Sequence, residues 1–472
     1  MLTDLSFVAD GKPWPPEDTD EAARLKEHAF MRQIYNGLHE KVFPRYIAYL
    51  ADQSKDSKKQ KIILDWPELA TDSYINLLLG EEPEIVAGNR DDLPDLPADQ
   101  AFIDVSRYGI GLFEVSDAGI QALNPENCYI VVTPGNIQRP QAFVFFHIWK
   151  EKESQSGKEK EIEYIKFTVH QPGKIRHLIF LISSGAGLTK SEKKLSGPLP
   201  LGNFPAYAGL EVDAEGYQYP PVEDMLVVAV QNKLSSERYY GQSDYKPSII
   251  SLIESLELLF AQRAEVLAKF TSPTPIVPES ATVFNHSTQE WEYKAGQAII
   301  TKPGDPSPSL MVWQAELGAV DRAIEQSMDQ LLQMLQLSRV LLAGQGQGTA
   351  ESGTALRIRL IPTLAKVSKY ARAAETAIPK VLHLWSQLHP PEILIEEIEV
   401  KLKDGIPDDP MEEANVNNIR ATALATLKTV GIIGRKGALQ MAFDSGLLKA
   451  LPGLDVEQSI DQLLSESLDE LI

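Results

Sequence analysis

The stretch Pro247 to Phe270, PSIISLIESLELLFAQRAEVLAKF, has the hydrophobic period of one long helix, and it directly follows Tyr240-Gly-Gln-Ser-Asp-Tyr245. Its apolar residues recur every three or four positions, which predicts a single buried stripe. That stripe comprises Ile249, Leu252, Ile253, Leu256, Leu259, Phe260, Leu267 and Phe270. The charged residues Glu254, Glu257, Arg263 and Lys269 are predicted to face away from it. At 1.5 Å per residue, such a helix is about 36 Å long.

A second helix with the same kind of stripe is predicted from Leu317 to Leu342. The segment between the two helices is rich in proline and contains four short β-rich runs, at residues 282–284, 291–293, 298–300 and 310–313. Two long helices joined by a small β element make an extended helical hairpin with a β cap at one end.

After this hairpin, Ala343-Gly-Gln-Gly-Gln-Gly-Thr-Ala-Glu-Ser-Gly353 reads as a glycine-rich loop. A helix is then predicted from Thr354 to Leu388, interrupted by Pro362 and Pro379. Between Thr354 and Lys380 it has six basic residues and one acidic residue, Glu375, in a chain whose formal net charge is −21. The basic residues are Arg357, Arg359, Lys366, Lys369, Arg372 and Lys380. This charge needs a partner, which is either the phosphates of DNA or the acidic surface of a neighbouring subunit or domain.

The rest of the chain divides into a mixed N-terminal part and a helical C-terminal part. Helices are predicted at residues 18–50, split near Pro44, and at residues 67–79. Residues 81–99 read as a loop, and residues 100–240 as a meandering antiparallel β region in which residues 150–160 form a hairpin tip and helix resumes at residues 222–236. A strand at residues 393–402 is followed by a helical, acidic tail. The expected fold class is therefore α+β.

Composition limits the possible classes of protein. A chain of 472 residues exceeds one hydrophobic core, so several subdomains are expected. The single cysteine, Cys128, cannot form an intramolecular disulfide, which favours a reducing compartment. No run approaches the roughly 20 apolar residues that span a bilayer, and the N-terminus lacks the pattern of a secretory signal, so we expect no membrane association. The net charge of −21 opposes tight, non-specific binding to DNA.

Motifs for catalysis or cofactor binding are not found in the sequence. The Gly344-Gln-Gly-Gln-Gly348 run lacks the Gly-Lys-Ser/Thr ending of a phosphate-binding loop and follows a helix rather than a strand. His383 and His389 are six residues apart, which is not a metal-binding spacing. We therefore expect no enzymatic activity, no metal and no cofactor.

Taken in order, these segments resemble the portal proteins of tailed bacteriophages, over about residues 65 to 450. Tyr240-Gly-Gln-Ser-Asp-Tyr245 and the helix after it resemble the start of the family's stem. The sequence Leu337-Ser-Arg-Val-Leu-Leu-Ala-Gly344, continued by Glu351-Ser-Gly-Thr-Ala-Leu-Arg-Ile-Arg-Leu360, resembles the tunnel loop and the start of the spine helix. Ile406-Pro-Asp-Asp409, leading to Thr429-Val-Gly-Ile-Ile433, is similar to the family's passage into the crown.

The resemblance implies a division of the chain into named parts of the portal fold. The wing would comprise residues 1–246, and the two stem helices residues 247–270 and 314–342, with the clip, residues 271–313, between them. The tunnel loop would be residues 343–353, the spine helix and the C-terminal part of the wing residues 354–403, and the crown residues 404–472. The first 60 residues contain no motif that places them in this scheme.

Function and partners also follow from the resemblance. It implies a homo-oligomeric ring, usually of about twelve subunits, at one vertex of the virion capsid, with assembly in the host cytoplasm. Double-stranded DNA would pass through the ring during genome packaging and ejection, driven by a separate terminase large subunit. Further partners would be head-to-tail adaptor, major capsid and scaffold proteins.

The resemblance also assigns candidate site residues. The tunnel loop would include Gly344, Gln345, Gly346, Gln347, Gly348 and Thr349. The spine helix would bend at Pro362, and Arg357, Arg359, Lys366, Lys369 and Arg372 would contact DNA or a neighbouring subunit. Two alternatives stand beside this interpretation. One is a structural or scaffold oligomer without a DNA channel, and the other is a packaging-associated nuclease or ATPase.

Overall fold

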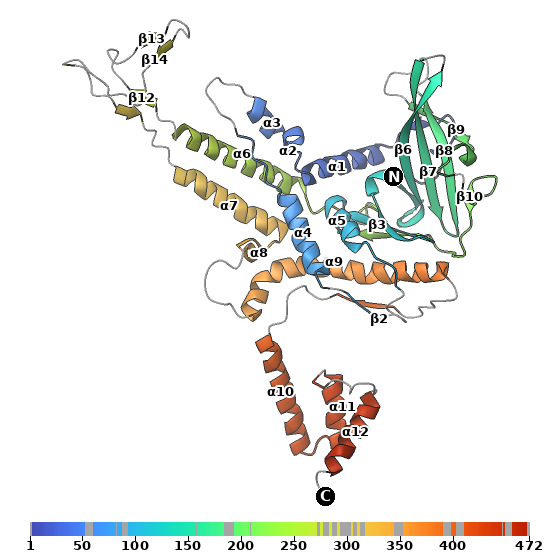
Figure 1. The fold of residues 1–472 in the computed structure, drawn as a ribbon, viewed down its shortest axis with the longest axis vertical. Helices are drawn as coiled ribbons and strands as arrows, with labels where there is room; N and C mark the ends of the chain where they lie inside the picture. The colour runs from blue at the N-terminus through green and yellow to red at the C-terminus, as the bar shows by residue number, and fades with distance from the viewer. Residues whose placement is uncertain are drawn as a thin grey trace. The chain divides into compact units, whose positions relative to one another are not determined.

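The computed structural model describes most of the chain, and its helices and strands are coloured along the sequence in Figure 1. The described residues are 2–51, 60–81, 83–86, 93–155, 158–183, 193–207, 209–270, 274–276, 283–285, 290–292, 304, 309–311, 317–343, 353–389, 398–402, 410–445, 447–448 and 456–469. They form two compact units. One comprises Met1–Leu342 with Pro362–Gly405, and the other comprises Ala343–Ile361 with Ile406–Ile472.

The larger unit is built on a seven-stranded sheet in which every described strand pair is antiparallel. Six strands follow the order β1-β9-β8-β7-β6-β5, and β10 pairs with the start of β8. Their bounds are β1 Pro13–Trp14, β5 Cys128–Thr133, β6 Asn136–Gln155, β7 Lys158–Gln171, β8 Lys174–Ser183, β9 Lys193–Leu199 and β10 Tyr217–Gln218. A smaller antiparallel sheet has the order β11-β3-β4, with β11 at Val227–Gln231, β3 at Ile110–Ser116 and β4 at Gly119–Leu123.

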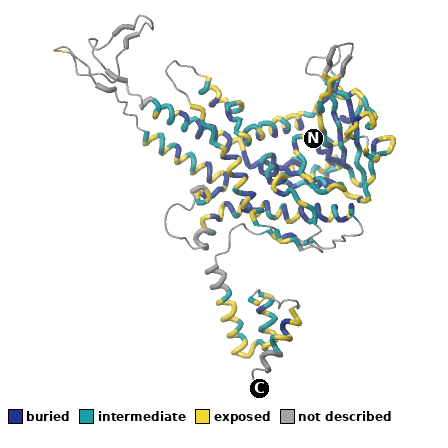
Figure 2. The backbone as a smooth tube through the Cα atoms, viewed as in Figure 1, coloured by how far each residue is buried: buried dark blue, intermediate teal, exposed yellow. Residues whose placement is uncertain are grey.

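Hydrophobic side chains cover both faces of the large sheet. On one face, Phe167 and Val144 pack with Trp14 and Phe7 from the N-terminal segment. On the other, Phe143 packs with residues of β3 and with the tyrosines that begin the Tyr240 motif. Figure 2 shows the resulting concentration of buried residues in the sheet and in the helices beside it. The mixture of antiparallel sheets and separate helices confirms the α+β class.

The helices of this unit precede and follow the sheets along the chain. Their bounds are α1 Thr19–Tyr35, α2 His39–Val42, α3 Pro44–Ala51, α4 Trp66–Leu79, α5 Ala98–Tyr108, α6 Pro247–Phe270, α7 Leu317–Leu335, α8 Arg339–Ala343 and α9 Gly353–Leu388. Both α9 and α8 extend past the boundary between the two units. A short pair, β2 (Glu84–Val86) with β16 (Glu399–Lys401), completes the unit.

The predicted helical hairpin is present, because α6 packs against α7 and the two run side by side in Figure 1. Arg263 Nε on α6 lies 2.5 Å from Asp321 Oδ1 on α7. Beyond the helix ends, β12 (Thr274–Ile276) pairs with β15 (Ser309–Met311), and β13 (Val283–Asn285) pairs with β14 (Glu290–Glu292). The strand expected at residues 298–300 lies outside the described residues.

Several expectations from the sequence are corrected by the structure. Residues 222–236 are not a helix, because the run Val-Val-Ala-Val pairs as β11 with β3. Helix α5 lies where the predicted loop at residues 81–99 meets the predicted β region, and no helix was expected there. The predicted hairpin tip at residues 150–160 is shorter than expected, since β6 and β7 remain paired as far as Gln155 and Lys158.

The long helices also differ in detail from the predictions. The helix predicted from Leu317 to Leu342 ends at Leu335, and Gln336 has a φ of +58° before α8 begins. Helix α9 continues through Pro362 and Pro379 without the expected interruption. The bend at Pro362 falls at the boundary of the two units and stays a prediction.

Besides the start of α9, the described residues of the smaller unit form the helices α10 (Pro410–Thr429), α11 (Arg435–Asp444) and α12 (Val456–Asp469). Helix α11 packs against both of the others. Lys436 Nζ lies 3.3 Å from Asp461 Oδ1, which joins α11 to α12, and Arg420 Nη1 donates to the carbonyl of Ser445 at 2.9 Å. The predicted helical tail is confirmed.

Candidate functional site

The Tyr240-Gly-Gln-Ser-Asp-Tyr245 motif passes between α5 and the end of β11 before α6 begins. The amide of Gln242 donates to the carbonyl of Asn232 at 2.8 Å, and the amide of Asp244 donates to the carbonyl of Ser106 at 3.0 Å. Gly241 is required at this crossing. A Cβ there would lie 2.2 Å from the carbonyl oxygens of both Asn232 and Gly109. The motif is therefore a fixed connection between the β-rich part and the helical hairpin.

Asp244 is the centre of this connection, and its side chain accepts five hydrogen bonds. Asn232 Nδ2 and Lys233 Nζ donate to its Oδ1 at 2.9 and 2.7 Å, and Lys366 Nζ donates to the same oxygen. Ser106 Oγ donates to Oδ2 at 3.1 Å, and the Tyr370 hydroxyl donates there as well. We call these six residues the Asp244 cluster. They come from α5, from the segment after β11, from the motif and from α9.

Both ends of the central ion pair are buried, since Asp244 is 4% exposed and Lys366 is 3% exposed. Burial alone would raise the pKa of Asp244, but the ammonium groups of Lys366 and Lys233 outweigh it and hold that pKa below its ordinary value. Burial lowers the pKa of Lys366 to about 8, although the nearby carboxylate opposes this shift. The ammonium of Lys366 also lies 4.6 Å from the centroid of the Tyr370 ring.

The structure separates the predicted basic contacts into two groups. Lys366 has its partner within the chain, so the expectation that it meets DNA or a neighbouring subunit is wrong for this residue. Lys369 and Arg372 are exposed on α9, and Arg359 is exposed near its start. Arg357 is half-buried. Residues 344–352, which include all six predicted tunnel-loop residues, lie outside the described residues.

Three further contacts join the hairpin to its surroundings. The Tyr74 hydroxyl on α4 donates to the carbonyl of Leu335, where α7 ends. The amide of Ser338 donates to Thr363 Oγ1 on α9 at 2.8 Å, next to the start of α8. The Tyr245 hydroxyl donates to the carbonyl of Pro67 at the start of α4. Helices α4, α7 and α9 are thus tied together at the base of the hairpin.

The N-terminal helices α2 and α3 contact helix α6, which the sequence did not indicate. His39 Nδ1 lies 2.5 Å from Glu257 Oε1, and its Nε2 donates to the carbonyl of Ile34 at 2.8 Å. Both side chains of this pair are fully buried. Burial alone would lower the pKa of His39, but the hydrogen bond and charge of Glu257 raise it above its ordinary value.

Arg45 forms the second contact between the N-terminal helices and α6. Its amide donates to Glu254 Oε1 at 2.7 Å, its Nε donates to Oε2 at 2.8 Å, and its Nη2 donates to the carbonyl of Ser251 at 3.0 Å. Glu254 is 7% exposed and Glu257 is fully buried, so the prediction that these two residues face away from the packed side of α6 is wrong. Each has a basic partner, supplied by residues 39–45, that makes its burial possible.

Three further properties of the described residues concern metal ligands, the thiol group and membrane-spanning helices. Among them, no three His, Cys, Asp or Glu side chains are grouped so that they could hold a metal ion. Cys128 is fully buried, and burial raises the pKa of its thiol well above the ordinary range. No described helix is long and apolar enough to cross a membrane.

Comparisons with known proteins give little further information. No family model and no curated protein matches the chain. Among solved structures it is similar to a chain from "Neck of empty GTA particle computed with C6 symmetry", with 10% sequence identity and a TM-score of 0.42. The match covers 90% of this chain and 94% of that chain. A likeness at this identity and TM-score does not by itself establish a function for this chain.

Proposed function

We propose that this chain is the subunit of a portal ring at one capsid vertex of a tailed phage or phage-like particle. The observation that carries the proposal is the antiparallel pair α6 and α7, which is closed at its far end by the β12-β15 pair and followed by the long helix α9. The same order of parts is implied by the sequence motifs. In this proposal α6 and α7 are the stem, the β pairs beyond them belong to the clip, and residues 1–246 are the wing.

The Asp244 cluster has a mechanical role in this proposal. A ring that retains DNA under load needs its stem helices fixed to its spine helix, and a buried ion cluster with directional hydrogen bonds holds one geometry better than apolar contacts that can slide. Residues 39–45 brace the outer side of α6 through Glu254 and Glu257. Force on α6 or α9 would therefore be shared by the wing.

Charge explains how DNA passes without adhering. With a net charge of −21, the chain offers few sites for phosphate binding, so a duplex inside the ring would be held by its dimensions rather than by affinity. We place the energy-consuming step in a separate terminase, docked at the clip and later replaced by adaptor proteins. The loop at residues 343–353 would line the channel, and Lys369 and Arg372 would contact either the duplex or the next subunit.

Images of the purified particle test this proposal against a structural oligomer that has no channel. The portal account predicts a ring whose axial hole admits a duplex about 20 Å wide, with the α6-α7 hairpins arranged around that hole. A closed particle, or a ring with the hairpins on its outer rim, would support the alternative and contradict the proposal.

A further inference from the structure

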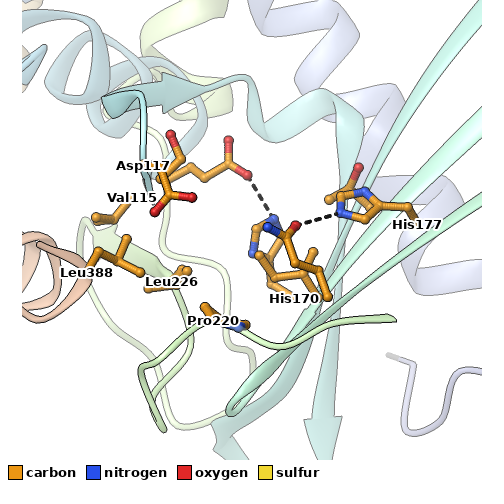
Figure 3. Close-up of a pocket in the computed structure, with 12 residues that line it drawn as sticks. Val115, Asp117, His170, His177, Pro220, Leu226 and Leu388 are labelled. Atoms are coloured by element: carbon orange, nitrogen blue, oxygen red, sulfur yellow. Dashed lines mark hydrogen bonds and ion pairs between the residues drawn. The ribbon is translucent and has the colours of Figure 1, made fainter. Parts of the chain in front are cut away.

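Two hollows in the described residues differ in what surrounds them. One is a cavity of about 150 Å³ between the large and small sheets of the larger unit, with Glu114, His170 and His177 in its wall (Figure 3). The other is an open groove on a single helix of the smaller unit, α10. A cavity of that volume holds only a few atoms, whereas a surface groove along a helix can receive the side chains of another helix. The groove on α10 is therefore the hollow that can serve in assembly.

The groove on α10 runs between two rows of side chains in which the residues are four positions apart. The first row is Asn418, Thr422 and Thr426, and the second row is Ile419, Ala423 and Leu427. Rows with this spacing are the ridges between which a neighbouring helix inserts its own side chains. Thr422 and Thr426 donate their hydroxyl hydrogen bonds to the carbonyls four residues earlier, at 2.7 and 2.8 Å. Their hydroxyls already have acceptors, so the groove is largely apolar.

Only one side of α10 is packed within the described part of the chain. Arg420 donates to the carbonyl of Ser445 at the end of α11, and Leu424 and Leu427, on the same side of α10 as Arg420, are half-buried. The other residues from 418 to 430 are exposed (Figure 2). Ile419 is 69% exposed, and Val430, on the same face about three turns later, is 67% exposed. Large apolar side chains that share an exposed face mark an interaction surface.

The exposed surface of α10 also has little charge and two different faces. From residue 417 to residue 430 the only charged residues are Arg420 and Lys428, in a chain in which 24% of the residues are charged. Because each residue turns the helix by about 100°, the side away from Ile419 presents the small side chains of Ala421 and Ala425, both exposed. A large-residue face and a small-residue face on one weakly charged helix are the complementary surfaces that packing against a copy of itself requires.

We propose that α10 packs against α10 of a second copy of this chain, with Ile419 of one copy beside Ala421 or Ala425 of the next. The contact is heterologous, because each copy turns one face of α10 to one neighbour and the opposite face to the other. Heterologous contacts of this kind close into a ring. The inference therefore rests on the proposed portal ring, and it assigns residues 418–430 to one of the interfaces of that ring.

Disulfide cross-linking of the full-length protein tests the proposal. The native Cys128 is fully buried, so the unchanged chain is the blank. We expect oxidation of Ile419→Cys/Ala421→Cys or of Ile419→Cys/Ala425→Cys to give a ladder of multimers in steps of one 52.3 kDa chain, because a disulfide joins Cβ atoms about 3.8 Å apart. Ile419→Cys alone should give no dimer, since the face it meets then has no thiol. The control pair Ile419→Cys/Glu457→Cys, whose second cysteine is exposed on α12, should give no ladder.

The native mass and images of the same oxidised samples separate this inference from the portal proposal. A ring that gives no ladder with either pair would overturn the α10 contact and leave the portal proposal standing. A dimer from Ile419→Cys alone would indicate an isologous contact and would also overturn the inference. A ladder from a particle without an axial hole would support the α10 contact and contradict the portal proposal. A monomer without a ladder would contradict both. All three positions are exposed, so the substitutions should leave the fold of each copy intact.

Discussion

Removing the charge of Asp244 should loosen the joint between the helical hairpin and α9. In Asp244→Asn, the ammonium of Lys366 stays 3% exposed but loses its carboxylate, and Lys233 loses the same partner. Breaking a buried ion pair from one side costs about 3–5 kcal/mol. Since about 1.4 kcal/mol is a factor of ten in an equilibrium constant, local opening should become more frequent by about two to four powers of ten.

Hydrogen exchange of peptides that cover residues 240–246 measures this opening directly. The amides of Gln242 and Asp244 are bonded across the joint, so their exchange reports on it rather than on global unfolding. Lys366→Met should cost less than Asp244→Asn, because Asp244 keeps its other four donors. The double variant should recover part of the loss, because no ammonium is then buried without a partner at that position. The exposed control Asp224→Asn should change opening by under about 0.5 kcal/mol.

Two results would refute this reasoning. The first is exchange of Asp244→Asn at the rate of the Asp224→Asn control, which would mean that the cluster does not hold the joint. The second is a double variant that is no more protected than Asp244→Asn, which would mean that the cost does not come from a Lys366 left without its carboxylate.

Three further predictions concern the connecting motif, the contact of His39 with α6, and the exposed basic residues. Gly241→Ala should lower the melting temperature or prevent folding, because its Cβ would meet two backbone carbonyls at 2.2 Å, whereas Gly202→Ala, with open space around it, should have little effect. The raised pKa of His39 predicts a stabilisation of the folded state that is fully present below the ordinary value of about 6.5 and is lost as pH rises through the folded-state pKa. With rising pH, amide exchange in α2 should therefore increase by more than the intrinsic chemical exchange rate does. This additional pH dependence should vanish in His39→Gln. Charge reversal of Lys369 and Arg372 should leave the monomer folded, and native mass then separates loss of assembly, which indicates a subunit contact, from a defect confined to DNA packaging.

The helices with a strong hydrophobic periodicity could be predicted from the sequence alone. Helices α4 and α6 agree within one residue with the predicted ranges, because strong periodicity and clear stop signals coincide there. Helix α5 was missed because it lies directly before β3 in a region whose β-branched runs dominate the pattern. At β11 a helix was predicted where the structure has a strand. Four consecutive apolar residues are compatible with a helix or a strand until the pairing strand is known.

The contents of the candidate site were less predictable than its position. The sequence indicated the Tyr240 motif as the start of the stem, but it did not indicate Asp244 as the partner of a lysine 122 residues away. A lysine on a basic helix looks like a surface residue, and only the fold brings α9 and the motif together. The burial of Glu254 and Glu257 has the same cause, because their partners are supplied by residues 39–45.

The native mass of the purified full-length protein at moderate salt is the most direct test of the central claim. A ring of about twelve copies of the 52.3 kDa chain would have a mass of roughly 630 kDa, and closed cyclic symmetry would give one discrete species rather than a ladder. The account predicts that species. A monomer or dimer that persists at high protein concentration would contradict the claim that this chain builds the ring by itself.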